Sequence, residues 1–165
     1  MTAPMSYPSP LYRGTTGEVT ATYRPAEGET PDIVNARTGN RVHYLATGDT
    51  TGGKFGLYRW EMGPGDGGPD PHFHRSISES FYVLDGSIAI FNGERWLDTE
   101  PGDWIHVPEG GIHGFKNRSG RPASMLIHFA PGAPREEYFE QVGQMRDHSD
   151  EERRAFFEKH DTYWV

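Results

Sequence analysis

Two tight-turn signals between short apolar runs constrain the fold of this chain most strongly. Asp85-Gly86 separates SFYVL from SIAIF, and Asn92-Gly93 separates SIAIF from ERWL. Such dipeptides between apolar runs are strong signals for β-hairpins, because both residues tolerate positive φ. The runs WIHV, IHGFK and ASMLIHF follow, each bounded by Gly- or Pro-rich turns. Strands of this length and spacing predict a mainly β protein built as a sandwich or barrel.

The two ends of the chain differ from this β-rich centre. We expect residues 1–30 to form an N-terminal arm, 31–133 a β barrel and 134–165 a helical extension. PREEYFEQVGQMR and SDEERRAFFEKH predict two short helices, and Ser149 with Glu152 has the spacing of a capping box. The final DTYWV carries three large apolar side chains, so we expect it to pack on the rest of the protein.

Composition and charge exclude several classes of protein. The chain has no cysteine, which excludes disulfide scaffolds, Cys-ligated zinc, iron–sulfur clusters and thiol nucleophiles. Its 16 Lys and Arg against 24 Asp and Glu give a net charge of −8, which disfavours nucleic acid and anionic lipid as partners. The apolar runs are too short to span a membrane. The first 14 residues carry no signal-peptide pattern, so we expect a cytoplasmic protein.

Three histidines and a glutamate are candidates for a metal site. His72 and His74 are two residues apart, so a strand would place both imidazoles on one face. Glu79 lies five residues beyond His74, an odd offset, and joins them only if a turn or bulge intervenes. His113 follows the turn PEGG. Each histidine alone is more simply a surface or hydrogen-bonded side chain, but together, without thiolate, the four favour Fe, Ni, Co, Mn or Cu over structural zinc.

Two segments carry these candidates in a recognisable pattern. HFHRSISESFYVLDG has the form H-x-H-x4-E-x6-G, and GDWIHVPEGGIHGFKN has the form G-x5-P-x-G-x2-H-x3-N. Both resemble the signature motifs of the cupin superfamily. The resemblance implies a double-stranded β-helix, or jelly-roll barrel. It also implies that one divalent transition metal (Ni, Fe, Co, Mn, Cu or Zn) is bound by His72, His74, Glu79 and His113.

Four aromatic residues are candidates for the lining of a substrate pocket. Strand alternation places one of them on the face of Glu79, one on the face of His113, and two on one face of the run FGLYRWEM. They are Phe81, Phe115, Tyr58 and Trp60. Two interpretations stay open: these rings line a cavity for a flat apolar substrate, or they fill the interior of a small barrel.

A finer resemblance concerns the reaction. The run TGDTTGGKFGLYRWEMGPGDGGPDPHFH followed by ESFYVLDG, and the later APREEYFEQVG, are similar to bacterial single-domain quercetin 2,3-dioxygenases. This implies a dioxygenase that uses O2 to cleave a flavonol-like or other enolisable aromatic small molecule with loss of carbon monoxide. Glu79 would be both a metal ligand and the catalytic base. The alternatives are a non-oxidative isomerase or polyketide cyclase, and a metal-containing module that only binds a small molecule.

The resemblance also bears on assembly. Small cupins resemble one another in pairing through edge strands, and an open sheet edge favours association. We therefore expect a homodimer to which residues 41–47 contribute. The alternative is a monomer whose N-terminal arm covers its own edge.

Overall fold

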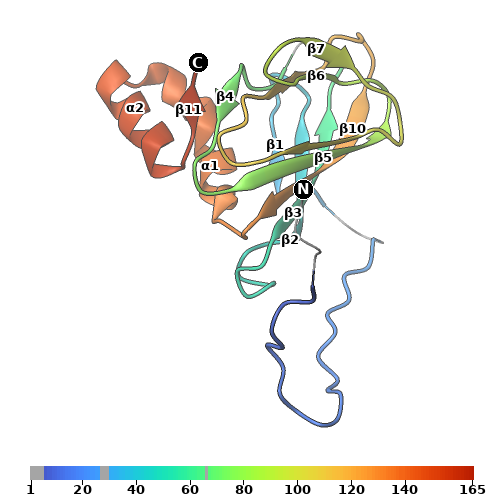
Figure 1. The fold of residues 1–165 in the computed structure, drawn as a ribbon. Helices are drawn as coiled ribbons and strands as arrows, with labels where there is room; N and C mark the ends of the chain where they lie inside the picture. The colour runs from blue at the N-terminus through green and yellow to red at the C-terminus, as the bar shows by residue number, and fades with distance from the viewer. Residues whose placement is uncertain (1–5, 27–29, 66) are drawn as a thin grey trace.

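The computed structural model describes residues 6–26, 30–65 and 67–165, and strands dominate it (Figure 1). In chain order the elements are β1 (Ile33–Val34), β2 (Arg41–Ala46), β3 (Gly56–Met62), β4 (His72–Phe73), β5 (Ser78–Asp85), β6 (Ala89–Phe91), β7 (Trp96–Asp98), β8 (Trp104–Val107), β9 (Gly114–Lys116), β10 (Ala123–Ala130), α1 (Arg135–Gln141), the 3-10 helix η1 (Val142–Asp147), α2 (Asp150–Lys159) and β11 (Tyr163–Trp164). The mainly β class with a short C-terminal helical region is confirmed.

The strands form a large and a small antiparallel sheet around one apolar core. The large sheet has the order β1-β2-β3-β10-β5-β8, and the small sheet has the order β7-β6-β9. Burial alternates along all eight residues of β10, so one face of the large sheet points inward. The core joins side chains of both sheets, including Phe81 and Ile127 from the large one and Ile90 and Phe115 from the small one. This is the arrangement of a closed jelly roll.

The two predicted hairpins have different outcomes in the structure. At Asp85-Gly86 the prediction is wrong, because β5 and β6 belong to different sheets and the turn carries the chain from one sheet to the other. Gly86 has φ 71°, and a Cβ there would lie 2.6 Å from the carbonyl oxygen of Pro122. At Asn92-Gly93 the hairpin prediction is confirmed, because the turn joins the paired antiparallel strands β6 and β7. The Asn92 amide donates to the Arg95 carbonyl at 3.1 Å, and the Asn92 side chain accepts from the amides of Glu94 and Arg95.

The C-terminal segment closes one end of the barrel. The capping box at the start of α2 is confirmed: the Ser149 hydroxyl accepts from the Glu152 amide, and the Glu152 carboxylate accepts from the Ser149 amide. After α2 the chain forms β11, which pairs with β4 through Tyr163 with Phe73 and Trp164 with His72. The expectation that DTYWV packs on the body is therefore confirmed, and it packs on the strand that carries His72.

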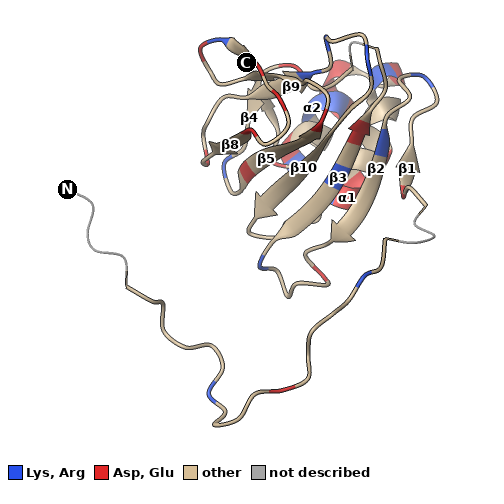
Figure 2. Ribbon diagram, turned by 90° about the vertical axis from the view of Figure 1, so that its right-hand side faces the viewer, with Lys and Arg blue, Asp and Glu red and all other residues tan. Residues whose placement is uncertain are grey.

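The N-terminal arm lies away from the barrel. Residues 6–26 are exposed throughout and extend from the body as a long loop (Figure 2). The expected arm also includes 1–5 and 27–29, which lie outside the described residues. None of the helices in the described part of the chain has the length and apolar character needed to cross a bilayer.

The edge of the large sheet is partly covered by the chain itself. Two residues of β1 pair with the start of β2, as Ile33 with Val42 and Val34 with Arg41. The rest of β2 forms no further strand pairing on that side within the described residues. The homodimer therefore stays a prediction, and sedimentation at micromolar concentration tests it: a single 18.6 kDa species would contradict it.

Candidate metal centre and its cavity

The four candidate ligands come from separate parts of the barrel that strand pairing brings together. His72 lies on β4, Glu79 lies on β5, and His113 directly precedes β9. His72 and His113 form an isolated antiparallel bridge in which each amide donates to the other's carbonyl at 2.8 Å. The break needed between His74 and Glu79 is present, because β4 ends at Phe73 and β5 begins at Ser78. All four side chains are buried, none more than 4% exposed.

The ligand atoms of these residues converge on one point. The chosen nitrogen or oxygen atoms of His72, His74, Glu79 and His113 all lie within 4.8 Å of one another. Glu79 Oε2 lies 2.8 Å from His113 Nε2 and 3.1 Å from His74 Nε2. Among the described residues no other group of His, Asp or Glu side chains meets this criterion.

Backbone carbonyls orient the three imidazoles. The Nδ1 atoms of His72, His74 and His113 lie 2.8, 2.5 and 2.9 Å from the carbonyl oxygens of Asp70, Asp161 and Gly111. A carbonyl only accepts, so each Nδ1 must donate its hydrogen. In the neutral ring the lone pair is then on Nε2, the atom that faces the cluster, which is the usual arrangement of a metal-binding histidine.

The charges of the cluster fit a cation. Burial, with the neighbouring His113, lowers the pKa of His72 to about 3, so this ring is neutral at physiological pH. Burial alone would raise the pKa of Glu79, but the imidazoles of His113 and His74 hold it well below its usual range. Burial lowers the pKa of His113, yet the adjacent Glu79 carboxylate more than offsets this and raises it. The buried carboxylate therefore draws positive charge to this point, and a metal ion would replace the proton on His113.

The donor set is consistent with a resident metal. Three imidazole nitrogens and one carboxylate oxygen, without thiolate, suit Fe, Ni, Co, Mn, Cu or Zn as divalent ions. The two Nε2–Oε2 contacts require a proton or a metal between the atoms, because neutral Nε2 and an ionised carboxylate are both acceptors. This buried cluster thus resembles a cupin metal site.

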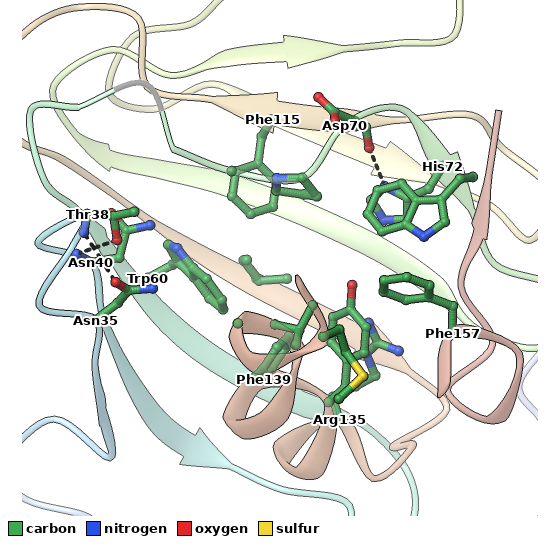
Figure 3. Close-up of a pocket in the computed structure, with 18 of the residues that line it drawn as sticks. Asn35, Thr38, Asn40, Trp60, Asp70, His72, Phe115, Arg135, Phe139 and Phe157 are labelled. Carbon is green, nitrogen blue, oxygen red and sulfur yellow. Dashed lines mark hydrogen bonds between the residues drawn. The ribbon is translucent and has the colours of Figure 1, made fainter. Parts of the chain in front are cut away.

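A cavity of about 530 Å³ opens beside the cluster and is lined by His72 and Glu79 among others. Of the four aromatic candidates, Trp60 and Phe115 line this cavity (Figure 3). Phe81 and Tyr58 are 0% exposed and are not among the lining residues. The Phe81 ring packs 5.7 Å from that of Phe115. The Tyr58 hydroxyl donates to Glu136 at 2.5 Å, so it anchors α1 to the barrel.

The other wall of the cavity comes from residues that the sequence motifs do not include. Arg135 and Phe139 of α1 and Phe157 of α2 point into it opposite Phe115 and His72 (Figure 3). Trp164 of β11 adds a ring 5.2 Å from that of His72. The resemblance of APREEYFEQVG to other cupins was the only signal in the sequence that α1 belongs near the site, and it assigned no role to Arg135 or Phe139.

Asp161 is a second residue that the sequence reasoning did not single out. Its backbone carbonyl accepts from His74, and its carboxylate accepts from the amides of Arg75 and Ser76 at 2.9 and 2.8 Å and from the Ser76 hydroxyl at 2.7 Å. Its φ is 49°, a left-handed conformation that Asp adopts more readily than most residues. Asp161 thus fixes both His74 and the loop that follows it.

Fold and site together define a small jelly-roll protein with a buried candidate metal centre, and comparison with known proteins gives its family. A family model described as "Cupin domain" matches residues 58–129. The tetracenomycin polyketide synthase protein TcmJ of Streptomyces glaucescens is 30% identical over 103 residues, which cover 61% of this chain and 68% of that protein. The chain belongs to the cupin family.

A second relative and two solved structures extend the comparison. Quercetin 2,3-dioxygenase of Bacillus subtilis is 31% identical over 80 residues, 48% of this chain but 23% of that protein, so the chain spans less than a quarter of its length. KdgF from Halomonas sp. superposes with a TM-score of 0.59 at 16% identity, covering 70% of this chain and 97% of that one. The polyketide cyclase RemF from Streptomyces resistomycificus gives 0.50 at 28% identity, covering 58% and 67%.

Proposed function

We propose that this protein is a metal-dependent dioxygenase that cleaves a flavonol-like or other enolisable aromatic substrate with O2. The observation that carries the proposal is the double position of Glu79. Its Oε2 belongs to the ligand cluster, and the residue also lines the aromatic cavity. One carboxylate can therefore face both a metal ion and a bound substrate.

The residues of the site have distinct roles in this reaction. A divalent metal held by His72, His74, Glu79 and His113 would act as a Lewis acid and lower the pKa of a substrate hydroxyl. Glu79 would accept the hydroxyl proton, because its carboxylate belongs to the ligand cluster and also lines the cavity where the substrate would lie. Trp60 and Phe115 contact the flat ring system. Overall, flavonol and O2 give a ring-opened ester that retains both oxygen atoms, and the excised carbon leaves as carbon monoxide.

A second candidate function is supported by different relatives. The likeness to TcmJ extends over 68% of that protein, and RemF is a polyketide cyclase. In a cyclase or isomerase the same Glu79 would remove a proton from an acidic carbon between two carbonyl groups, and no O2 would be consumed. The aromatic cavity suits the substrates of both reactions.

The experiment that tests the proposal measures O2 uptake, carbon monoxide and product mass together. The chain is reconstituted separately with Fe, Ni, Co, Mn, Cu and Zn and supplied with 3-hydroxyflavone, quercetin and an enolisable aromatic polyketone. The dioxygenase predicts O2 uptake matched by carbon monoxide release with at least one metal. Conversion without O2 uptake would contradict the dioxygenase and support the cyclase or isomerase. Absence of any conversion would contradict both and leave a binding module.

A further inference from the structure

A buried arginine without a carboxylate partner lies in the helical wall of the cavity. Arg135 is the first residue of α1, is 4% exposed and lines the cavity. Its Nη1 donates to the His160 carbonyl at 2.6 Å, and its guanidinium carbon lies 4.2 Å above the Tyr138 ring. Its Nε is buried without a hydrogen-bond partner, and no Asp or Glu in the described part of the chain forms an ion pair with it.

The charge of the cavity wall contrasts with that of the whole protein. The chain has a net charge of −8, yet the side chains that line this cavity include four arginines and only two acidic residues. They are Arg37, Arg135, Arg146 and Arg153 against Asp70 and Glu79. On the acidic side, Asp70 is already paired with Lys116 at 2.9 Å and Glu79 is occupied within the ligand cluster; on the basic side, Arg153 is paired with Asp150 at 3.6 Å, which leaves three arginines without an ion pair among the described residues. A divalent ion in the cluster would add further positive charge, so the cavity is a positive site in an acidic protein.

A buried cation of this kind is costly unless a partner neutralises it. We propose that the cavity binds an aromatic carboxylate whose acid group pairs with Arg135. The inference rests on the proposed function in so far as this cavity is the substrate site, and it adds the class of substrate, an aromatic acid. A guanidinium matches a carboxylate because its planar N–H groups can donate to both oxygens. The rings of Trp60, Phe115 and Phe139 would hold the aromatic part.

A purely structural role for Arg135 explains only part of its environment. The bond from Nη1 to His160 ties the start of α1 to the end of α2. A neutral donor could make that bond without burying a charge. A structural role does not explain why Arg135 Nε is left without a hydrogen-bond partner or why several arginines line the cavity. A bound carboxylate would explain the excess of positive charge.

The test compares two probes of the same shape on zinc-loaded protein. 2-Naphthoate and 2-naphthamide differ in charge but hardly in size, and calorimetry measures their dissociation constants. We expect wild-type protein to bind the naphthoate at least about tenfold more tightly, the scale of one charge-assisted contact. Arg135→Met is expected to abolish this preference while zinc content stays unchanged.

A matched control removes the same charge elsewhere. Arg118 stacks on Trp96 in the small sheet and is not among the cavity-lining residues, so Arg118→Met should keep the preference. If Arg135→Met fails to fold, Arg135→Gln takes its place, because an amide can still donate to the His160 carbonyl without a charge. Circular dichroism and zinc content establish that each variant is folded and loaded.

Three results would overturn the inference. Equal affinity of the two probes for wild type, or binding of neither at millimolar concentration, would contradict an aromatic acid site. If the Arg135 variant still preferred the naphthoate, the carboxylate of the probe would be bound by zinc rather than by the guanidinium. Zinc is redox-inert and no O2 takes part, so this test is separate from that of the reaction. Failure of O2 uptake would refute the dioxygenase alone, and absence of the charge preference in the wild-type protein would refute only this inference.

Discussion

The two walls of the cavity are built by different means. In the barrel wall, strand pairing and backbone carbonyls fix the candidate ligands, as in the bridge between His72 and His113. In the helical wall, aromatic packing places the side chains, as where Tyr138 stacks on Phe156 with ring centres 5.7 Å apart. Under the proposed function these walls would have a division of labour: the barrel wall would supply the chemistry, and the helical wall would select the substrate.

The two walls meet at His74. Its Nδ1 donates to the carbonyl of Asp161, which lies beyond α2, so the C-terminal segment supports one ligand of the barrel wall. The two walls are therefore not independent. Substitutions in each wall should show how strongly the C-terminal segment affects metal binding by the barrel wall.

The largest effect is expected in the barrel wall itself. His74→Ala removes one of the four candidate ligands. Loss of a residue that only orients a ligand lowers metal affinity by about 10- to 100-fold, so loss of the ligand itself should lower it by about 100-fold or more. The fold should persist, because strand pairing does not depend on the imidazole. Elemental analysis and circular dichroism measure both. His106→Ala is the control, since that ring lies on β8 and hydrogen-bonds to Ser80 instead. Unchanged metal content in His74→Ala would show that this histidine is not a ligand.

The next effect separates the two roles of Glu79. Glu79→Gln keeps the size of the side chain and one oxygen donor but loses basicity. Metal should be largely retained because three imidazoles remain, while turnover should fall by roughly 100-fold, the usual scale for loss of a general base. Metal occupancy and O2 uptake are measured on the same sample. Parallel loss of both would mark Glu79 as a ligand only, and full activity at full occupancy would exclude the base role.

A smaller effect is expected where the two walls meet. Asp161→Ala removes the carboxylate that anchors the loop after His74, so metal affinity should fall by about tenfold, the lower range for a residue that orients a ligand. Asp161→Asn should restore part of it, because Asn also accepts hydrogen bonds and tolerates positive φ. Asp150→Ala, an exposed position at the start of α2, is the control. If metal affinity were unchanged in Asp161→Ala, the helical wall would have no influence on the metal site through this contact.

The pH dependence of the same contact has a definite sign. Burial alone would raise the pKa of Asp161, but hydrogen bonds from Ser76 and Arg75 lower it below its ordinary value. The stabilisation by this carboxylate is therefore fully present above the ordinary pKa of an aspartate and is lost as the pH falls through the lowered value. The difference in unfolding free energy between metal-free wild type and Asp161→Ala should be constant near neutral pH and shrink in acid. A difference that grows in acid would contradict the assigned contact.

The smallest effect is expected at the start of α2, on the side of the helical segment that does not face the cavity. Ser149→Ala removes the cap of α2 and should lower the free energy of unfolding by roughly 0.5–2 kcal/mol. Metal content should not change, because no ligand depends on this hydroxyl. Urea unfolding and elemental analysis measure the two quantities. Loss of metal from this variant would show that the fold of α2 controls the barrel wall more strongly than the contacts indicate.

The same two walls show how far the sequence could be interpreted. Period-2 alternation correctly placed Phe81 on the same inward face as Glu79, because burial on one face of a strand leaves a regular pattern. The break before Glu79 followed from its odd offset. The motif spacing selected four residues that the structure brings within one cluster.

Other features could not be obtained in this way. The Asp85-Gly86 dipeptide gives the local turn but not the sheet that the next strand joins, which depends on pairing between distant segments. Arg135 sits at the start of a helix in a run of charged residues, and only tertiary packing buries it. The contact of His74 with Asp161 spans 87 residues and uses a backbone carbonyl, so no side-chain pattern announces it.

The most direct test of the account is to locate the metal itself. Crystals of the metal-loaded protein, measured at the absorption edge of the bound element, should show one ion whose ligands are Nε2 of His72, His74 and His113 and an oxygen of Glu79. The ligand distances should be about 2.0–2.4 Å, the usual range for nitrogen and oxygen donors. An ion bound elsewhere, or one that leaves His113 or Glu79 uncoordinated, would contradict the central claim that these four residues form one metal centre at the edge of the substrate cavity.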